Sequence, residues 1–188
     1  MLDVIEQAII DKITAAKTSG AMAYLKTVDS YGGQLDGDLG EVIRSYPAIW
    51  VVFGGCGKPQ KHGANLWKVP ATFVLMYAAR NVRNEKAARK GGLGEVGTYQ
   101  MIEHGKVLLL NQDLGIEIEA FQPGAVRPLY NTKIRNDALS VISQEWTTAY
   151  VAKAPTVEEG DLLSVGMTYF LKPGDNVADA SDLLTLEP

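Results

Sequence analysis

The chain has 188 residues, a formal net charge of -4 and 46% hydrophobic residues, which predicts an ordinary globular protein that needs no metal or disulfide to hold its fold. The acidic balance argues against general binding to nucleic acid, which depends on lysine and arginine, and against adhesion to an anionic membrane. One cysteine excludes an internal disulfide, and no apolar run reaches the length of a membrane span. The N-terminus lacks the features of a signal peptide, so we expect a protein that is used in the cytoplasm or in a particle assembled there.

Residues 2–17 are predicted to form an amphipathic helix. Their apolar side chains recur every three or four positions and therefore share one face: Leu2, Ile5, Ile9 and Ile13. We expect a strand at about 22–29, a glycine-rich loop at 32–38 and a short helix over 38–46, which ends at Pro47.

Two strands are predicted in the next part of the chain. The continuous apolar run 48–53 is typical of a central strand that is buried on both faces. The glycine-rich segment 54–65 is predicted to be a long loop, and a strand follows over 66–79. Because Pro70 cannot donate a hydrogen bond to a ladder, this strand is either at an edge there or starts after it.

A second main helix is predicted over 99–110, with Thr98 as its cap. The preceding segment 80–97 is polar, basic and interrupted by glycines, which indicates a connector. Gly105 lowers the helix propensity of its segment by about 1 kcal/mol, a cost that is tolerated where the helix backbone packs closely on a sheet.

The last third of the chain alternates between apolar and polar residues. The alternation predicts strands at 116–119, at 139–151, where Ile142, Trp146 and Tyr150 share one face, and at 164–172. Such a pattern favours an antiparallel sheet with one face against helices. We therefore expect an α+β fold, a mostly antiparallel mixed sheet packed by two main helices, as a single domain over 1–173 with an acidic tail over 174–188.

One motif, Gly92-x-Gly94-x-x-Gly97, matches the dinucleotide-binding fingerprint and precedes a predicted helix, whose N-terminus would bind a pyrophosphate. That fingerprint should directly follow a buried strand, whereas here it follows the polar segment 84–90. A connector is therefore favoured over a nucleotide site.

No other cluster completes a catalytic or metal site. Cys56 and His62 share one predicted loop, but a zinc site takes at least three protein ligands, and no orienting group accompanies them as a nucleophilic pair. Asp36 and Asp38 lack the remaining ligands of a calcium loop. We expect no catalytic residue, no cofactor and no metal.

Several segments together resemble one family of phage proteins. They are the N-terminal amphipathic helix, Tyr99–Ile102, Leu114–Ile116, Pro123–Asn131 (PGAVRPLYN) and the strand Val141–Tyr150. The chain resembles the small tail-region protein of Mu-like phages and prophages, which is encoded just before the sheath and tube proteins and is similar in role to tail terminators. The resemblance covers about residues 1–172, apart from the segment 54–65.

The resemblance implies a structural subunit and not an enzyme. Terminators cap the finished tail tube and present it to the head, so the implied partners are other copies of the chain in a ring, with sixfold symmetry, the tail tube protein and the head–tail connector. The implied location is the virion tail, after assembly in the host cytoplasm. No membrane or specific nucleic acid is bound, although DNA passes through the ring. The alternatives are a nucleotide-binding protein or small enzyme that uses the Gly92–Gly97 loop, or another head–tail connector protein.

Candidate contact residues come from three places in the chain. They are the only basic cluster, two carboxylates on the exposed side of the predicted strand 116–119, and the leucines of the acidic tail: Arg80, Arg83, Lys86, Arg89, Lys90, Glu117, Glu119, Leu183, Leu184 and Leu186. Basic runs of this kind often pair with acids of a neighbouring subunit. The tail is too polar to form a core alone, so its leucines are expected to dock on a neighbour or partner.

Overall fold

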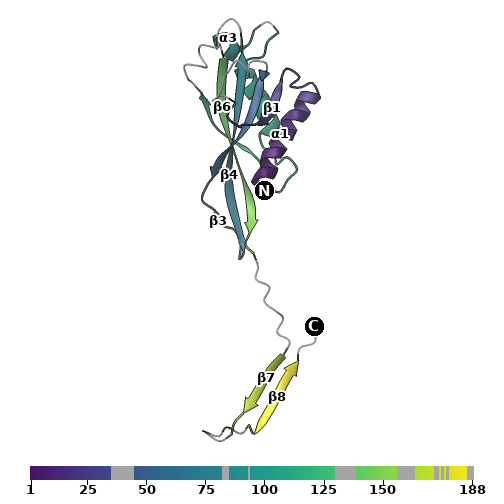
Figure 1. Ribbon diagram of the computed structural model, residues 1–188, viewed down its shortest axis with the longest axis vertical. Coiled ribbons are helices and arrows are strands. Elements are labelled where there is room, and N and C mark those ends of the chain that lie inside the picture. Colours follow the sequence, from purple (N-terminus) through teal and green to yellow (C-terminus); the bar gives the residue numbers. More distant parts are fainter. Residues whose placement is uncertain are drawn as a thin grey trace. The chain divides into compact units, whose positions relative to one another are not determined.

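The computed structural model describes residues 1–34, 45–81, 85–92, 94–129, 139–155, 164–171, 174, 176 and 178–185. Contacts divide the chain into two compact units, Met1–Ala154 and Pro155–Pro188. The first unit holds the main sheet, and the second holds a separate two-stranded sheet (Figure 1). The division lies ahead of the boundary at 173/174 expected from the sequence, because residues 164–169 pair with 180–185 and not with the main sheet. Most of the helix predicted over 38–46 lies outside the described residues.

The main sheet has the strand order β1-β2-β4-β6-β5, with β3 beside β4. Its strands are β1 (Thr27–Ser30), β2 (Ala48–Cys56), β3 (Gln60–Lys61), β4 (Leu66–Arg80), β5 (Gln122–Pro128) and β6 (Leu139–Lys153). Only β1 and β2 pair in parallel, and every other pairing in this sheet is antiparallel. The predicted mostly antiparallel mixed sheet is therefore confirmed.

Two main helices pack on one face of the sheet, as predicted. They are α1 (Leu2–Thr18) and α4 (Thr98–Leu109), and a six-residue helix, α3 (Glu85–Lys90), precedes α4. The apolar stripe of α1 enters the same buried cluster as side chains from α4 and the sheet: Ile5, Ile9, Ile13, Met101, Ile102, Leu109, Phe73, Leu75, Tyr77, Ile142 and Trp146. No helix in the described part of the chain is long and apolar enough to cross a membrane.

The second face of the sheet has its own apolar cluster. It is built around Trp50, which meets Tyr31 and Tyr46 edge-on at ring-centroid distances of 6.2 and 5.9 Å. Because Ile49 and Val51 enter the first cluster while Trp50 enters the second, β2 is buried on both faces here. This confirms the central strand that the apolar run 48–53 predicted.

The loop predicted over 54–65 is wrong in part, because β2 continues to Cys56 and β3 lies within the segment. The ladder between β2 and β4 shifts register between Phe53 and Gly55. Gly54 lies so close to Thr72 that a side chain would be crowded, and Gly55 has a φ of 115°. These glycines therefore carry the strand through a bulge and do not end it.

Pro70 lies inside β4, which begins before it at Leu66. Its carbonyl accepts a hydrogen bond of 2.9 Å from the Gly57 nitrogen, and a strand residue directs its nitrogen to the same side as its carbonyl. On that side β3 pairs with β4 at Lys68 and β2 pairs with β4 at Ala71, and neither strand pairs with the residues in between. Pro70 thus lies at the gap where the neighbour of β4 changes from β3 to β2, which resembles the first of the two alternatives, an edge.

Three local predictions are corrected by the structure. The strand expected at 22–29 is only β1, since residues 20–24 form turns. The residue before α4 is Gly97, and Thr98 does not cap the helix, because its hydroxyl lies 3.0 Å from that of Ser140 on β6. The expected strand 116–119 is a loop with a single bridge between Ile118 and Tyr150.

The second unit is a hairpin of β7 (Ser164–Tyr169) and β8 (Ala180–Thr185). The strand predicted over 164–172 is thus present, and part of the expected tail is its pairing partner. Its alternating apolar residues were expected to pack against helices, but Val165, Met167 and Tyr169 are 38, 37 and 47% exposed. The hairpin by itself is therefore an amphipathic ribbon with one apolar side.

Gly105 packs directly on the sheet, which is the condition under which a glycine in this helix is tolerated. A side chain there would overlap the hydroxyl of Tyr77, which is fully buried and donates a 3.2 Å hydrogen bond to Gln144 Oε1. We expect Gly105→Ala to lower the free energy of unfolding by about 1–2 kcal/mol despite the better helix propensity of alanine, because overpacking outweighs it. Urea denaturation followed by the fluorescence of the buried tryptophans measures this loss.

The double variant Tyr77→Phe/Gly105→Ala is the control for this prediction. Removal of the Tyr77 hydroxyl removes the nearest atom, so the double variant should lose less stability than the sum of the two single losses. Additive losses would show that the close approach of α4 to β4 does not matter.

Candidate functional site

The far ends of β4 and β6 form an arm, defined here as Leu66–Ala71 paired with Thr148–Lys153. The strand β2 pairs with β4 only as far as Ala71, and β5 pairs with β6 only as far as Thr147. Beyond these points the two-residue β3 is the only strand beside the arm among the described residues. Figure 1 shows β4 and β6 continuing past the end of the helix-covered part of the sheet. The arm is therefore a narrow element. Its exposed side chains are Trp67, Val151 and Lys153, whereas Val69, Ala71, Thr148 and Ala149 are buried.

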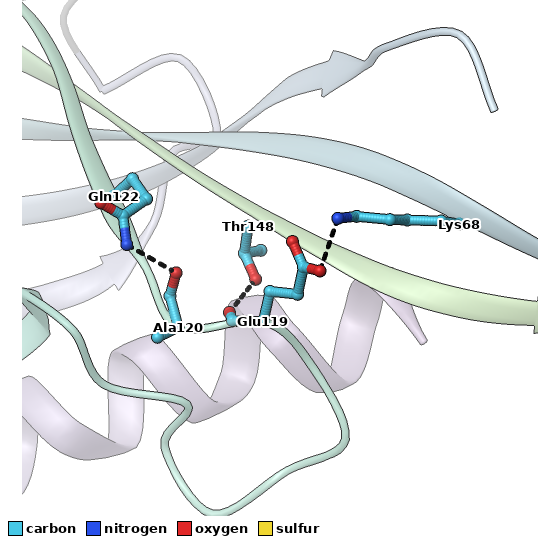
Figure 2. A network of polar contacts seen from close by, with 5 residues as sticks. All are labelled: Lys68, Glu119, Ala120, Gln122 and Thr148. Carbon is cyan, nitrogen blue, oxygen red and sulfur yellow. Dashed lines mark hydrogen bonds and ion pairs between the residues drawn. The ribbon is translucent and has the colours of Figure 1, made fainter. Parts of the chain in front are cut away.

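A polar network connects the arm, through Lys68 and Thr148, to the loop that precedes β5 (Figure 2). The Thr148 hydroxyl donates a 2.5 Å hydrogen bond to the Glu119 carbonyl, and Lys68 Nζ lies 2.5 Å from Glu119 Oε1. Within the loop, Gln122 Nε2 donates to the Ala120 carbonyl at 3.4 Å. Glu119 thus ties together both strands of the arm, one through its backbone and the other through its side chain.

The end of the arm is basic, although the protein as a whole is acidic. Lys58, Lys61 and Lys153 are exposed, and no Asp or Glu occurs in residues 54–68 or 149–155. Lys61 stands opposite Trp67 in the ladder between β3 and β4, and Trp67 is 42% exposed. We call Lys58, Lys61, Trp67 and Lys153 the arm tip. Sequence reasoning missed this surface, although the absence of acids from both segments was a usable signal.

The glycines at 91–97 form a closed turn between α3 and α4. Gly92 and Glu95 exchange two backbone hydrogen bonds of 3.1 Å each. Backbone atoms of Arg89 and Gly91 lie so close to Gly97 that no side chain fits there. The described part of the polar segment before the motif contains the short helix α3 and no strand, and the chain's own backbone accounts for the need for glycine at position 97.

The predicted basic cluster is only partly an open surface. Lys86 and Lys90 are exposed on α3, whereas the Arg89 guanidinium lies over the Tyr99 ring at 5.8 Å from its centroid. Arg80 has an interaction partner within the chain, and Arg83 lies outside the described residues. The two lysines are therefore the members that remain candidates for contact with another molecule.

The predicted carboxylates and leucines are also separated by the structure. Glu117 is exposed on the loop, while Glu119 is engaged with Lys68 of the same chain. Leu183 and Leu184 lie next to each other on β8 and so face opposite sides of the hairpin. Leu186 lies outside the described residues. Their contacts with another subunit stay a prediction.

The candidate chemical residues do not come together as a site. Cys56 is exposed at the end of β2, and His62 is exposed in the turn between β3 and β4. The other histidine, His104, lies with its Nδ1 at 2.9 Å from the Tyr24 hydroxyl, a contact that joins α4 to the turn after α1. Asp36 and Asp38 lie outside the described residues, and within those residues no group of His, Cys, Asp and Glu side chains could hold a metal ion.

Comparison with models of known protein families gives a match. A family model described as "Bacteriophage Mu, Gp37" matches residues 1–151, which end within β6 and span nearly all of the main-sheet unit. No curated protein matches the chain. The family indicates a virion-associated structural protein of a phage. Because the match covers most of its length, the chain belongs to the bacteriophage Mu Gp37 family.

Proposed function

We propose that the protein is a tail-terminator or tail-completion subunit, which assembles into a ring, caps the tail tube and joins it to the head–tail connector. The observation that carries this proposal is the family match over residues 1–151. Family membership indicates a phage structural protein, and the terminator is the role that we propose within that class. The ring, its sixfold symmetry and its position in the virion tail belong to the proposal.

The physical task of a terminator is to stop a repeating contact. A tail tube elongates because each added layer presents the surface that binds the next one. A contact between two different patches closes into a ring only when its rotation fits, and otherwise it propagates. A terminator therefore needs a contact that closes around the ring and an end face that matches the tube.

The edges of the main sheet support contacts through side chains rather than through added strands. The edge strand β1 has only four residues. The other edge, β5, contains Pro123 and Pro128, and its register shifts between Pro123 and Val126. Short strands, prolines and bulges all discourage another strand from pairing at an edge. A subunit that must not extend a filament benefits from edges of this kind.

The proposed partners follow from this role. They are further copies of the chain, the tail tube protein and the head–tail connector, with DNA passing through the ring and no specific nucleic acid or membrane bound. A different connector protein of the same assembly is the second candidate, and it shares the family match.

Removal of the gene from a producing phage tests the terminator role. Without a cap, the growing end of the tube keeps a free binding surface, so tails should be of abnormal length or should fail to join heads. Electron micrographs of lysates measure both quantities, and the wild-type gene supplied in trans should restore them. Normal tails joined to heads in the absence of the gene would eliminate the terminator role and leave an accessory one.

We also expect the protein to bind no nucleotide. The closed turn at 91–97 brings its own backbone against Gly97, and no strand directly precedes the motif. Calorimetric titration with NAD, ATP or GTP should show no saturable heat. Gly94 adopts a positive φ of 77° with open space around it, so Gly94→Val changes the turn through its backbone conformation and not through a clash. A saturable heat that this substitution abolishes would contradict the expectation.

A further inference from the structure

We propose that the β7–β8 hairpin of one subunit docks through its apolar face on the arm tip of a second copy of this chain. The inference rests on the proposed ring, for which it names the contact between neighbouring subunits. Two observations carry it: the hairpin has one distinct apolar face, and the arm tip offers the apolar and basic surface that this face requires.

The register of the hairpin sorts its side chains into two different faces. Residues that stand opposite each other in an antiparallel pair lie on the same face. One face carries Ser164, Gly166, Thr168, Ser181, Leu183 and Thr185, whereas the other carries Val165, Met167, Tyr169, Ala180, Asp182 and Leu184. The second set is the apolar face, and its large side chains are 37 to 53% exposed. An isolated two-stranded hairpin is marginally stable in water, so a partner that covers this face would stabilise it.

Charge indicates what kind of surface covers the apolar face. Residues 155–188 contain seven Asp or Glu and one Lys. Asp182 stands opposite Met167 on the apolar face itself. Two hairpins packed face to face would bring these carboxylates together in an apolar contact, where repulsion and desolvation both oppose binding. The fitting partner is therefore apolar and basic.

Among the described residues of the main-sheet unit, the arm tip is a surface that meets this requirement. Trp67 supplies exposed aromatic area, and Lys61 stands opposite it in the ladder. Lys153, at the end of the arm, and Lys58, just before β3, are further exposed cations without a nearby acid in sequence. The described ion pairs involve none of these three lysines.

Two other surfaces fit the hairpin less well. The depressions beside α1 are lined by Asp3, Asp11 and Asp113, which would repel it. Beside α3, the Tyr99 ring of α4 is already in contact with the Arg89 guanidinium of α3 in the same chain.

The need for a ring favours a second copy as the occupant. A ring contact joins two different patches, so every subunit must carry both of them. The hairpin and the arm tip are such a pair, one acidic and apolar and the other basic and apolar, and each copy can use both at once. Docking on the arm tip of the same chain would use up both patches without joining subunits.

Four full-length variants test this contact by analytical ultracentrifugation. Leu184→Asp changes the apolar face, and Lys61→Glu/Lys153→Glu reverses the charge of the arm tip. Their matched controls are Leu183→Asp, on the opposite face of the same strand, and Lys86→Glu/Lys90→Glu, on the other basic surface. The first two variants should weaken self-association at least about tenfold, since a buried leucine or a paired charge is lost. The controls should stay within about twofold of wild type, as expected for surface changes outside the contact.

A mixing experiment decides between docking on another copy and docking on the same chain. The Leu184→Asp subunit keeps a working arm tip, and the Lys61→Glu/Lys153→Glu subunit keeps a working hairpin. An equimolar mixture of the two should therefore form a one-to-one dimer and nothing larger, and added salt should weaken it. Circular dichroism and tryptophan fluorescence should show that each variant folds as wild type does.

Several outcomes would overturn the contact. They are a mixture without a heterodimer, equal effects of Leu183→Asp and Leu184→Asp, a loss of association with the α3 charge reversal alone, or a wild-type chain that is monomeric at all concentrations. Any of these outcomes would overturn the hairpin contact but not the terminator role, which gene removal tests separately. Conversely, normal tails without the gene would eliminate that role while a heterodimer in the mixture still established the contact.

Discussion

The pairing of β4 with β6 is the constraint on which the rest of the structure depends. Both strands have fifteen residues, and they pair along their full length without a shift in register. At the centre of this ladder Phe73 stands opposite Trp146, and both are fully buried. The helices cover one face of this pair, β2 and β5 extend it sideways, and its uncovered end becomes the arm. The body and the proposed contact surface are thus two parts of one ladder.

The elements that could be predicted from the sequence are those whose signal is local. The stripe of α1, the apolar run of β2 and the alternation in β6 each lie within one short segment, and packing against the core agrees with them. The predictions that were wrong concern residues whose structure depends on segments far away in the sequence. Gly54 continues a strand because Thr72 of β4 lies against it, and Thr98 meets Ser140 of β6 instead of capping its helix. No local pattern contains that information.

The loop before β5 shows why alternating apolar and polar residues alone do not predict a strand. Ile116 and Ile118 are partly buried while Glu117 and Glu119 are exposed, so the burial alternates as in a strand. A single bridge joins the segment to β6, and Glu119 adds backbone hydrogen bonds to Thr148 and Ala149 of β6 and an ion pair with Lys68 of β4. Alternating burial reports that a segment lies against a core, whereas a strand also needs a neighbour in register.

The candidate surfaces could be predicted only in part, for a related reason. Lys86, Lys90, Leu183 and Leu184, which the sequence alone singled out, are exposed, and their contacts with another molecule stay a prediction. The register was needed to separate Leu183 from Leu184, and the end points of β2 and β5 were needed to reveal the arm. Both depend on pairings between strands that the sequence pattern leaves open.

The central ladder also determines the order in which the chain can fold. Between β4 and β6 the chain forms α3, α4 and β5, so the longest pairing in the protein joins segments that are far apart in sequence. Pairings of this kind form slowly, because the entropy cost of closing a large loop comes before any stabilising contact forms. During synthesis β4 has β2 as a neighbour but must wait for β6, and until then one side of an apolar strand lies open to aggregation. The hairpin leaves the ribosome only after β6, when the body of the same subunit already has all of its strands.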